Sequence, residues 1–137
     1  MKPLRIKPGP GQESVWDYPR PPRLEAFSGH IKVILNGVTI ADTRGAMRVL
    51  ETSHPPVYYI PPTDIHREYI FQCSGTSYCE WKRLAHYFTI VVGQKSAEKT
   101  AWYYPYPSPE YSAIKDFVAF YPGFMDACYF NGLWREN

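Results

Sequence analysis

An Asn-Gly dipeptide between two β-rich runs limits the choice of fold more than any other part of this sequence. Ile31–Leu35 precedes Asn36-Gly37, and Val38–Ala41 follows it. This arrangement favours a type I′ turn, because that turn needs positive φ at both central positions, which Asn and Gly tolerate. The segment therefore predicts a β-hairpin.

Short extended runs continue along the chain, and turn residues separate them at intervals of roughly 8–12 residues. Residues 69–71 and 78–81 are expected as two strands around a turn at Ser74-Gly75. Residues 110–117 have helical spacing. The pattern predicts a mainly β, antiparallel domain of about nine short strands with one or two short helices.

The length of 137 residues fits one domain. Residues 1–28 are rich in Pro and Gly, so we expect this segment to run extended over the surface. We divide the chain into an N-terminal arm, residues 1–13, and a single all-β domain, residues 14–137.

Charge and hydropathy argue against two classes of partner. The formal net charge is +2, which is too small to indicate a nucleic-acid partner. No apolar run approaches the roughly 18–20 residues of a membrane helix. The N-terminus has no apolar core behind its basic residues, unlike a secretory signal. We therefore expect a cytoplasmic protein that binds neither nucleic acid nor membrane.

The three cysteines are Cys73, Cys79 and Cys128. An odd number without a CxxC pair argues against a disulfide framework and against a four-cysteine zinc site. No metal and no cofactor is expected.

Cys79 and Lys82 form the first candidate reactive pair, because a nearby ammonium can stabilise a thiolate nucleophile. In a regular strand, residues three apart face opposite sides, so this pair needs a bend to meet. The alternative is that Cys79 is a small buried apolar residue. We assign Cys79 a tentative catalytic role and Lys82 the binding of an anionic group.

Glu51 and His54 form the second candidate pair, because a carboxylate can orient an imidazole as a general base. His54 precedes Pro55-Pro56, a rigid segment that could present the ring to a cleft. The alternative is that Glu51 ends a strand and His54 bonds to backbone at a corner.

Aromatic residues make up 17% of the chain, and 12 of them are Tyr. Because neighbours on a strand point to opposite faces, Tyr58 and Tyr59 should lie on opposite sides, as should Trp102 and Tyr103. One set is expected in the core, and the other along a groove where rings stack on a flat ligand. We assign Tyr58, Trp102 and Tyr104 to ligand binding, with core packing as the alternative for each.

Several longer motifs together resemble one protein family. They are Trp16–Pro22, Glu51–Pro61, Tyr78–Lys82, Ala101–Pro105 and Phe117–Pro122. Across residues 14–132 the chain is similar to small bacterial or cyanobacterial members of the domain of unknown function 427 family. The resemblance implies a β-tent-like fold, in which antiparallel sheets meet at an angle. Related β-tent domains often bind zinc through paired CxxC motifs, which this chain lacks.

The family is sometimes labelled nucleotidyltransferase-like, and that label implies acidic residues that hold a divalent metal. The sequence has no GxxxxGK[ST] phosphate loop. Its candidate aspartates lie on different elements: Asp42, Asp64, Asp116 and Asp126.

Three functional hypotheses follow. The first is a domain that binds a small polar or anionic ligand in an aromatic-lined pocket between the sheets, with or without catalysis. The second is a protein-interaction or homodimerisation module without catalysis. The third is metal-dependent nucleotidyl transfer. The sequence leaves open whether the protein is an enzyme.

Overall fold

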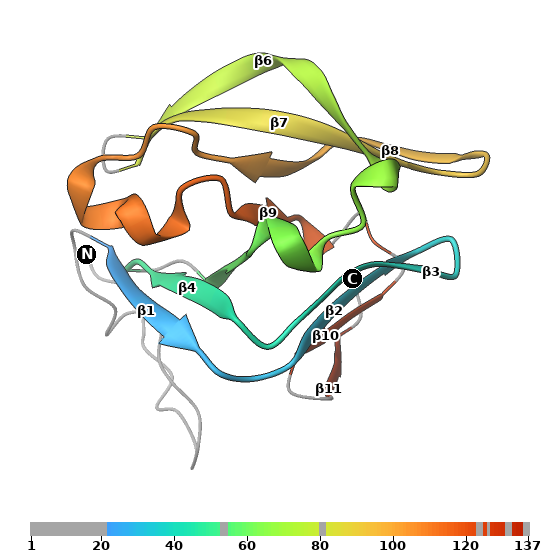
Figure 1. The fold of residues 1–137 in the computed structure, drawn as a ribbon, viewed down its shortest axis with the longest axis horizontal. Helices are drawn as coiled ribbons and strands as arrows, with labels where there is room; N and C mark the ends of the chain where they lie inside the picture. Colours follow the sequence, from blue (N-terminus) through green and yellow to red (C-terminus); the bar gives the residue numbers. More distant parts are fainter. Residues whose placement is uncertain are drawn as a thin grey trace, which may run out of the picture.

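The computed structural model describes residues 22–52, 55–79, 82–122, 125, 127–130 and 133–135. The expected arm, residues 1–13, lies outside the described residues, as does His54. The described strands form two antiparallel sheets, and the helical segments between them are short 3₁₀ turns (Figure 1). The prediction of a mainly β, antiparallel domain is confirmed.

The larger sheet has seven strands, in the order β1-β4-β5-β9-β8-β7-β6. In Figure 1 it runs from β6 and β7 at the top to β1 and β4 below. Its strands, in sheet order, are β1 (Arg23–Phe27), β4 (Ala46–Leu50), β5 (Val57–Ile60), β9 (Val118–Phe120), β8 (Lys95–Tyr103), β7 (Arg83–Val92) and β6 (Ile70–Cys79).

The smaller sheet has four strands, in the order β11-β10-β2-β3. Their bounds are β11 (Leu133–Arg135), β10 (Ala127–Phe130), β2 (Ile31–Leu35) and β3 (Val38–Thr43). The described 3₁₀ helices are η2 (Pro62–Asp64), η3 (Arg67–Tyr69) and η4 (Pro109–Ile114).

The predicted hairpin around Asn36-Gly37 is confirmed. Leu35 pairs with Val38, and the two turn residues have φ of 50° and 74°. The Asn36 side chain also donates a hydrogen bond of 3.0 Å to the backbone oxygen of Val92 at the end of β7. The turn of the smaller sheet is thereby joined to the larger sheet.

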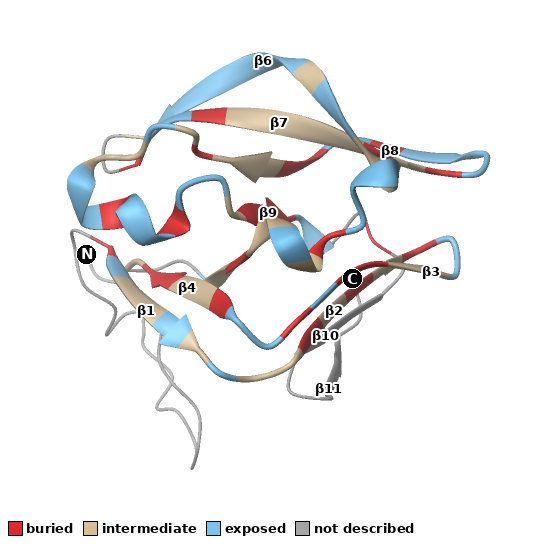
Figure 2. Cartoon of the chain, in the orientation of Figure 1, coloured by how far each residue is buried: buried red, intermediate tan, exposed pale blue. Residues whose placement is uncertain are grey.

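Two groups of buried side chains cover the two faces of the seven-stranded sheet. The first cluster lies between the sheets and includes Leu35 of β2 and Ile90 of β7. The second cluster lies on the opposite face, where Ile114 of η4 packs with Tyr59 of β5 and Ala119 of β9. Figure 2 shows buried residues on β2, β4, β7 and β9, whereas β6 is mostly exposed.

The expected turn at Ser74-Gly75 is wrong. β6 runs from Ile70 to Cys79 and pairs with β7 on both sides of these residues. The register shifts between Cys73 and Thr76, so the extra residues form a bulge in one strand. Gly75 has φ of +101°, a conformation that residues with a Cβ rarely adopt.

The structure differs from the sequence-based expectations in two further segments, β1 and η4. β1 lies within the segment that we expected to run as an extended arm, and it is held by pairing with β4 and by a contact between Arg48 and Glu25. The expected helix over 110–117 is the 3₁₀ helix Pro109–Ile114. It cannot continue through Asp116, because the φ of that residue is +64°.

No helix among the described residues is both long and apolar enough to span a bilayer.

The first cluster generates a prediction about stability. Leu35 is fully buried between the sheets, whereas Leu84 on β7 is 48% exposed. We expect Leu35→Ala to lower the free energy of unfolding by about 3 kcal/mol, because it leaves a cavity in the core. The matched control Leu84→Ala should cost less than about 1 kcal/mol. Urea denaturation measures both, and equal losses would contradict a core shared by the two sheets.

Candidate functional site

The seven-stranded sheet separates two groups of polar and aromatic side chains. One group surrounds Lys82 and Cys79 on the face that η4 covers. The other lines a pocket on the opposite face, the one that the first cluster occupies. The candidate residues from the sequence are divided between these faces.

Cys79 and Lys82 lie on the same side of the sheet. Cys79 ends β6 and packs at the edge of the second cluster. Lys82 precedes β7 and is only 8% exposed. Its Nζ lies 5.7 Å from the ring centroid of Tyr104 and 5.9 Å from that of Tyr111, both in the second cluster. Arg83, which follows Lys82, has φ of +73°, outside the range of a regular strand.

These contacts give the Lys82 ammonium a place among aromatic rings. A cation over the face of a tyrosine ring is stabilised by about 0.5–2 kcal/mol, more as water is excluded. Lys82 thus joins the start of β7 to η4, which carries Tyr111. The described surroundings of the Lys82 ammonium are thus two tyrosine rings.

Trp102 and Tyr104 belong to a hydrogen-bonded aromatic network around Tyr59. The indole Nε1 of Trp102 donates to the Tyr59 hydroxyl at 3.4 Å, and the Tyr59 and Tyr104 side chains are hydrogen-bonded. Tyr121 packs on the outer side of Trp102, with ring centroids 4.3 Å apart. Tyr111 donates a hydrogen bond of 2.8 Å to the backbone oxygen of Pro22, which precedes β1.

Burial controls the ionisation of these tyrosines. It raises the pKa of Tyr59 and of Tyr104 far above the ordinary value of 10. Burial also raises the pKa of Tyr111, and the proximity of Cys79 raises it further. The three hydroxyls are therefore neutral at physiological pH and act as hydrogen-bonding groups, not as bases.

The structure does not bring Glu51 and Tyr58 to one place. Glu51 follows β4, is partly buried, and lies near enough to Tyr111 for its charge to raise the pKa of that tyrosine. Tyr58 packs with the first cluster and meets Phe27 edge to face, with ring centroids 4.9 Å apart. Its neighbour Tyr59 is in the second cluster, so the predicted alternation is confirmed. His54 lies outside the described residues.

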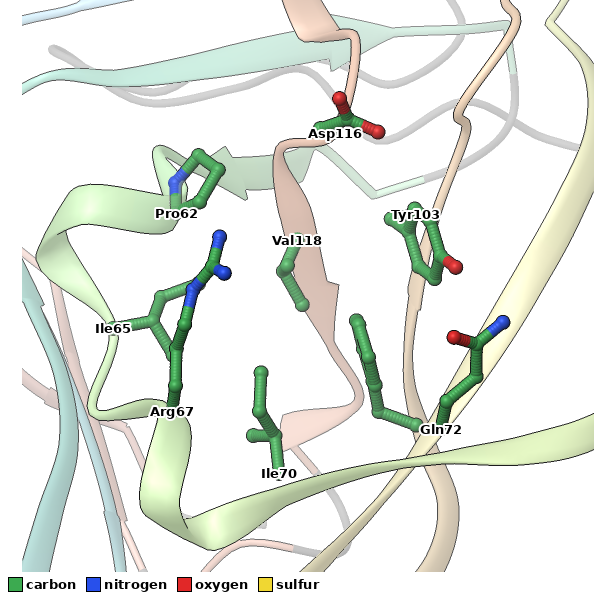
Figure 3. Close-up of a pocket in the computed structure, with 9 residues that line it drawn as sticks. Pro62, Ile65, Arg67, Ile70, Gln72, Tyr103, Asp116 and Val118 are labelled. Carbon is green, nitrogen blue, oxygen red and sulfur yellow. The ribbon is translucent and has the colours of Figure 1, made fainter.

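A pocket of about 400 Å³ lies on the face of the first cluster (Figure 3). Its apolar lining comes from η2, the start of β6, and the central strands. Those residues are Pro62, Ile65, Ile70, Phe88 and Val118. The rings of Phe88 and Tyr103 stack at one side, with centroids 4.8 Å apart and planes 20° apart.

Polar groups line the same pocket: Arg67 of η3, Gln72 of β6, Tyr103 of β8, and Asp116. In Figure 3, Arg67 and Asp116 come from different elements, with the Asp116 carboxylate at the upper edge and pointing away from Arg67, and Gln72 lies beside Tyr103. Burial raises the pKa of Tyr103, and the Asp116 carboxylate raises it further. The Tyr103 hydroxyl is thus kept protonated.

Sequence reasoning assigned none of these four polar residues to ligand binding. Alternation on β8 did place Tyr103 opposite Trp102, and this is confirmed by their separate clusters. That signal could have led to Tyr103, but Arg67 and Asp116 stand on short turns without a motif. Their convergence depends on the path of η3 and on the positive φ of Asp116.

The buried tyrosines predict how stability depends on pH. Folding raises their pKa above 10, so the unfolded chain releases protons first as the pH rises. Stability should be constant with respect to these groups below pH 10, and should fall above it by about 1.4 kcal/mol per pH unit for each tyrosine. Tyr59→Phe removes one of these hydroxyls, so it should reduce the loss of stability by about 1.4 kcal/mol per pH unit above pH 10. Urea denaturation between pH 9 and 11 measures this dependence.

The matched control is Tyr106→Phe, because the Tyr106 side chain is 76% exposed. It should leave the slope unchanged. An identical slope in the Tyr59→Phe variant would show that Tyr59 does not stay protonated in the folded protein.

Comparison with known proteins identifies a family. No curated protein matches the chain. One family model does, NTP_transf_9, described as a domain of unknown function (DUF427), and the match extends over residues 23–131. This range includes β1 through β10 and both groups of candidate side chains. The chain is therefore a member of the DUF427 family.

Proposed function

We propose that the protein binds a small organic anion in the pocket between η2, η3 and the central strands. The observation that carries this proposal is a volume of about 400 Å³ with an apolar lining and a guanidinium, that of Arg67, among the groups that line it. Small-molecule sites typically combine an apolar cavity of this size with a few converging polar groups.

The chemistry of the lining supports this class of ligand. The stacked rings of Phe88 and Tyr103 offer a flat apolar surface for a planar body. Arg67 can hold a carboxylate or phosphate through two parallel hydrogen bonds. Gln72 and the protonated Tyr103 hydroxyl supply further donors.

We therefore assign anion binding to Arg67, and not to Lys82 as we expected from the sequence. Lys82 is buried over two tyrosine rings, and its cluster lies on the other face of the sheet from the pocket. Cys79 lies in that same cluster. The proposed function is therefore binding, and it includes no step at Cys79.

Two finer features belong to the same proposal. We propose that the two sheets form a β-tent-like arrangement, as the family resemblance implies, and that the protein acts in a bacterial cytoplasm. The two antiparallel sheets that enclose the first cluster support the first of these.

The test uses aromatic carboxylates as probes: 3-phenylpropanoate, indole-3-acetate and 4-methylbenzoate. Protein-observed NMR should show shifts at the backbone amides of pocket residues such as Ile70 and Tyr103. Arg67→Ala should weaken the tightest probe by at least about fivefold, because one charged partner is lost. The matched control Arg23→Ala removes the same charge from β1 and should leave affinity unchanged. If no probe shifts pocket amides, or if both variants bind alike, the proposal is wrong.

A second candidate function, self-association, is favoured by the exposed edge of β6. This strand has ten residues and contains no charged residue and no proline. Phe71 is 52% exposed and Tyr78 is 72% exposed, and Tyr78 pairs with Leu84, which is 48% exposed. Edge strands are normally protected by charges, proline, short length or bulges, and of these β6 has only the bulge at Ser74-Gly75. An uncharged strand can pair with a second copy of itself without placing like charges opposite each other.

We expect the chain to form dimers at high micromolar concentration, measured by size-exclusion chromatography with light scattering. Thr76→Lys places a charge on the exposed part of β6 and should return the protein to monomers. The control Thr63→Lys adds the same charge on exposed η2 and should leave the dimer intact. A monomer at every concentration would remove this candidate.

Nucleotidyl transfer, to which the short family name refers, has less support. Within the described ranges no three His, Cys, Asp or Glu side chains are grouped as metal ligands. Asp64 accepts a hydrogen bond of 2.6 Å from Thr43, and Asp42 contacts His30. Asp116 lines the pocket without a second carboxylate in the described lining, and Asp126 lies outside the described residues.

A further inference from the structure

The pocket is lined by two charges of opposite sign that do not neutralise each other. Arg67 is an exposed residue of η3, and Asp116 is an exposed residue after η4. Among the described residues, neither side chain takes part in an ion pair. Both charges are therefore available to an occupant of the pocket.

The main chain at Asp116 is held in place by backbone hydrogen bonds. The Asp116 N–H donates to the Tyr104 oxygen at 3.1 Å, and the Phe117 N–H donates to the Ile114 oxygen at 2.9 Å. These bonds fix the residue at φ of +64°, which is costly for a side chain other than Gly, Asn or Asp. Asp116 is thus a defined part of the pocket wall.

Asp116 weakens, but does not prevent, the binding of a ligand that carries only negative charge. A carboxylate repels an anionic group and attracts an ammonium, whereas Arg67 does the reverse. The other polar groups of the lining, Gln72 and the protonated Tyr103, are neutral. The ligand that satisfies both charges carries one of each sign.

Building on the proposed function, we infer that the ligand is a zwitterion. Its carboxylate or phosphate binds Arg67, its ammonium binds Asp116, and its apolar or aromatic body lies along Phe88 and Tyr103. An amino acid or a comparable amine-bearing acid has this chemistry.

The experiment uses two matched sets of probes on the full chain. The first set is phenylalanine, 3-phenylpropanoate and 2-phenylethylamine. The second is 4-(aminomethyl)benzoate, 4-methylbenzoate and 4-methylbenzylamine, in which the charges stand at opposite ends of a ring. Titration of the pocket amides by NMR gives each dissociation constant. In at least one set the zwitterion should bind about fivefold more tightly than either analogue, as one partly exposed ion pair would provide.

Asp116→Asn provides the decisive variant, because Asn tolerates positive φ and should keep the fold. It should remove the preference for the zwitterion and should leave or improve the affinity of the simple carboxylate. Asp42→Asn, a matched change at an exposed residue outside the pocket, should preserve the preference.

The outcomes separate this inference from the proposed function. If simple carboxylates shift the pocket amides and bind as tightly as the zwitterions in both sets, the zwitterion inference is overturned and anion binding stands. The inference also fails if Asp116→Asn strengthens zwitterion and carboxylate alike, because Asp116 then only repels. If no carboxylate of either kind reaches the pocket, both proposals are wrong.

Discussion

Burial of apolar side chains between the two sheets is the interaction on which the other features depend. Every second residue of β2 is buried, and these side chains pack with Ile90 and Phe120 of the larger sheet. The hydrogen bond from Asn36 to Val92 joins the hairpin turn to the same sheet. Because that face of the larger sheet is covered along much of its length, the pocket forms where the apolar lining gives way to η3 and Asp116.

The larger sheet also separates two groups of polar and aromatic side chains, one on each face. Adjacent residues of one strand point to opposite faces, so Trp102 joins the tyrosine network and Tyr103 lines the pocket. In the network, the Tyr59 hydroxyl accepts a hydrogen bond from Trp102, and the Lys82 ammonium lies over the ring of Tyr104. The pocket has polar groups without described ion pairs. The tyrosine network and the pocket therefore lie on different faces of one sheet.

Lys82 and Arg67 differ in their surroundings and in the chemistry of their charged groups. Lys82 is 8% exposed over the rings of Tyr104 and Tyr111, where a compact ammonium is stabilised by aromatic faces. Arg67 is exposed at a pocket and has a planar guanidinium suited to a carboxylate or phosphate. A sequence motif drew attention to the lysine, whereas the geometry of the pocket points to the arginine.

Local signals in the sequence were enough to determine the β class, the Asn36-Gly37 hairpin and the alternation of Tyr58 with Tyr59. Each of these depends on turn chemistry or on the two-residue period of a strand. Only the tertiary structure decided that Ser74-Gly75 is a bulge, that Cys79 and Lys82 share a face, and that Arg67 and Asp116 line one pocket. Those features arise from contacts between segments far apart in the chain, and no local pattern encodes which segments meet.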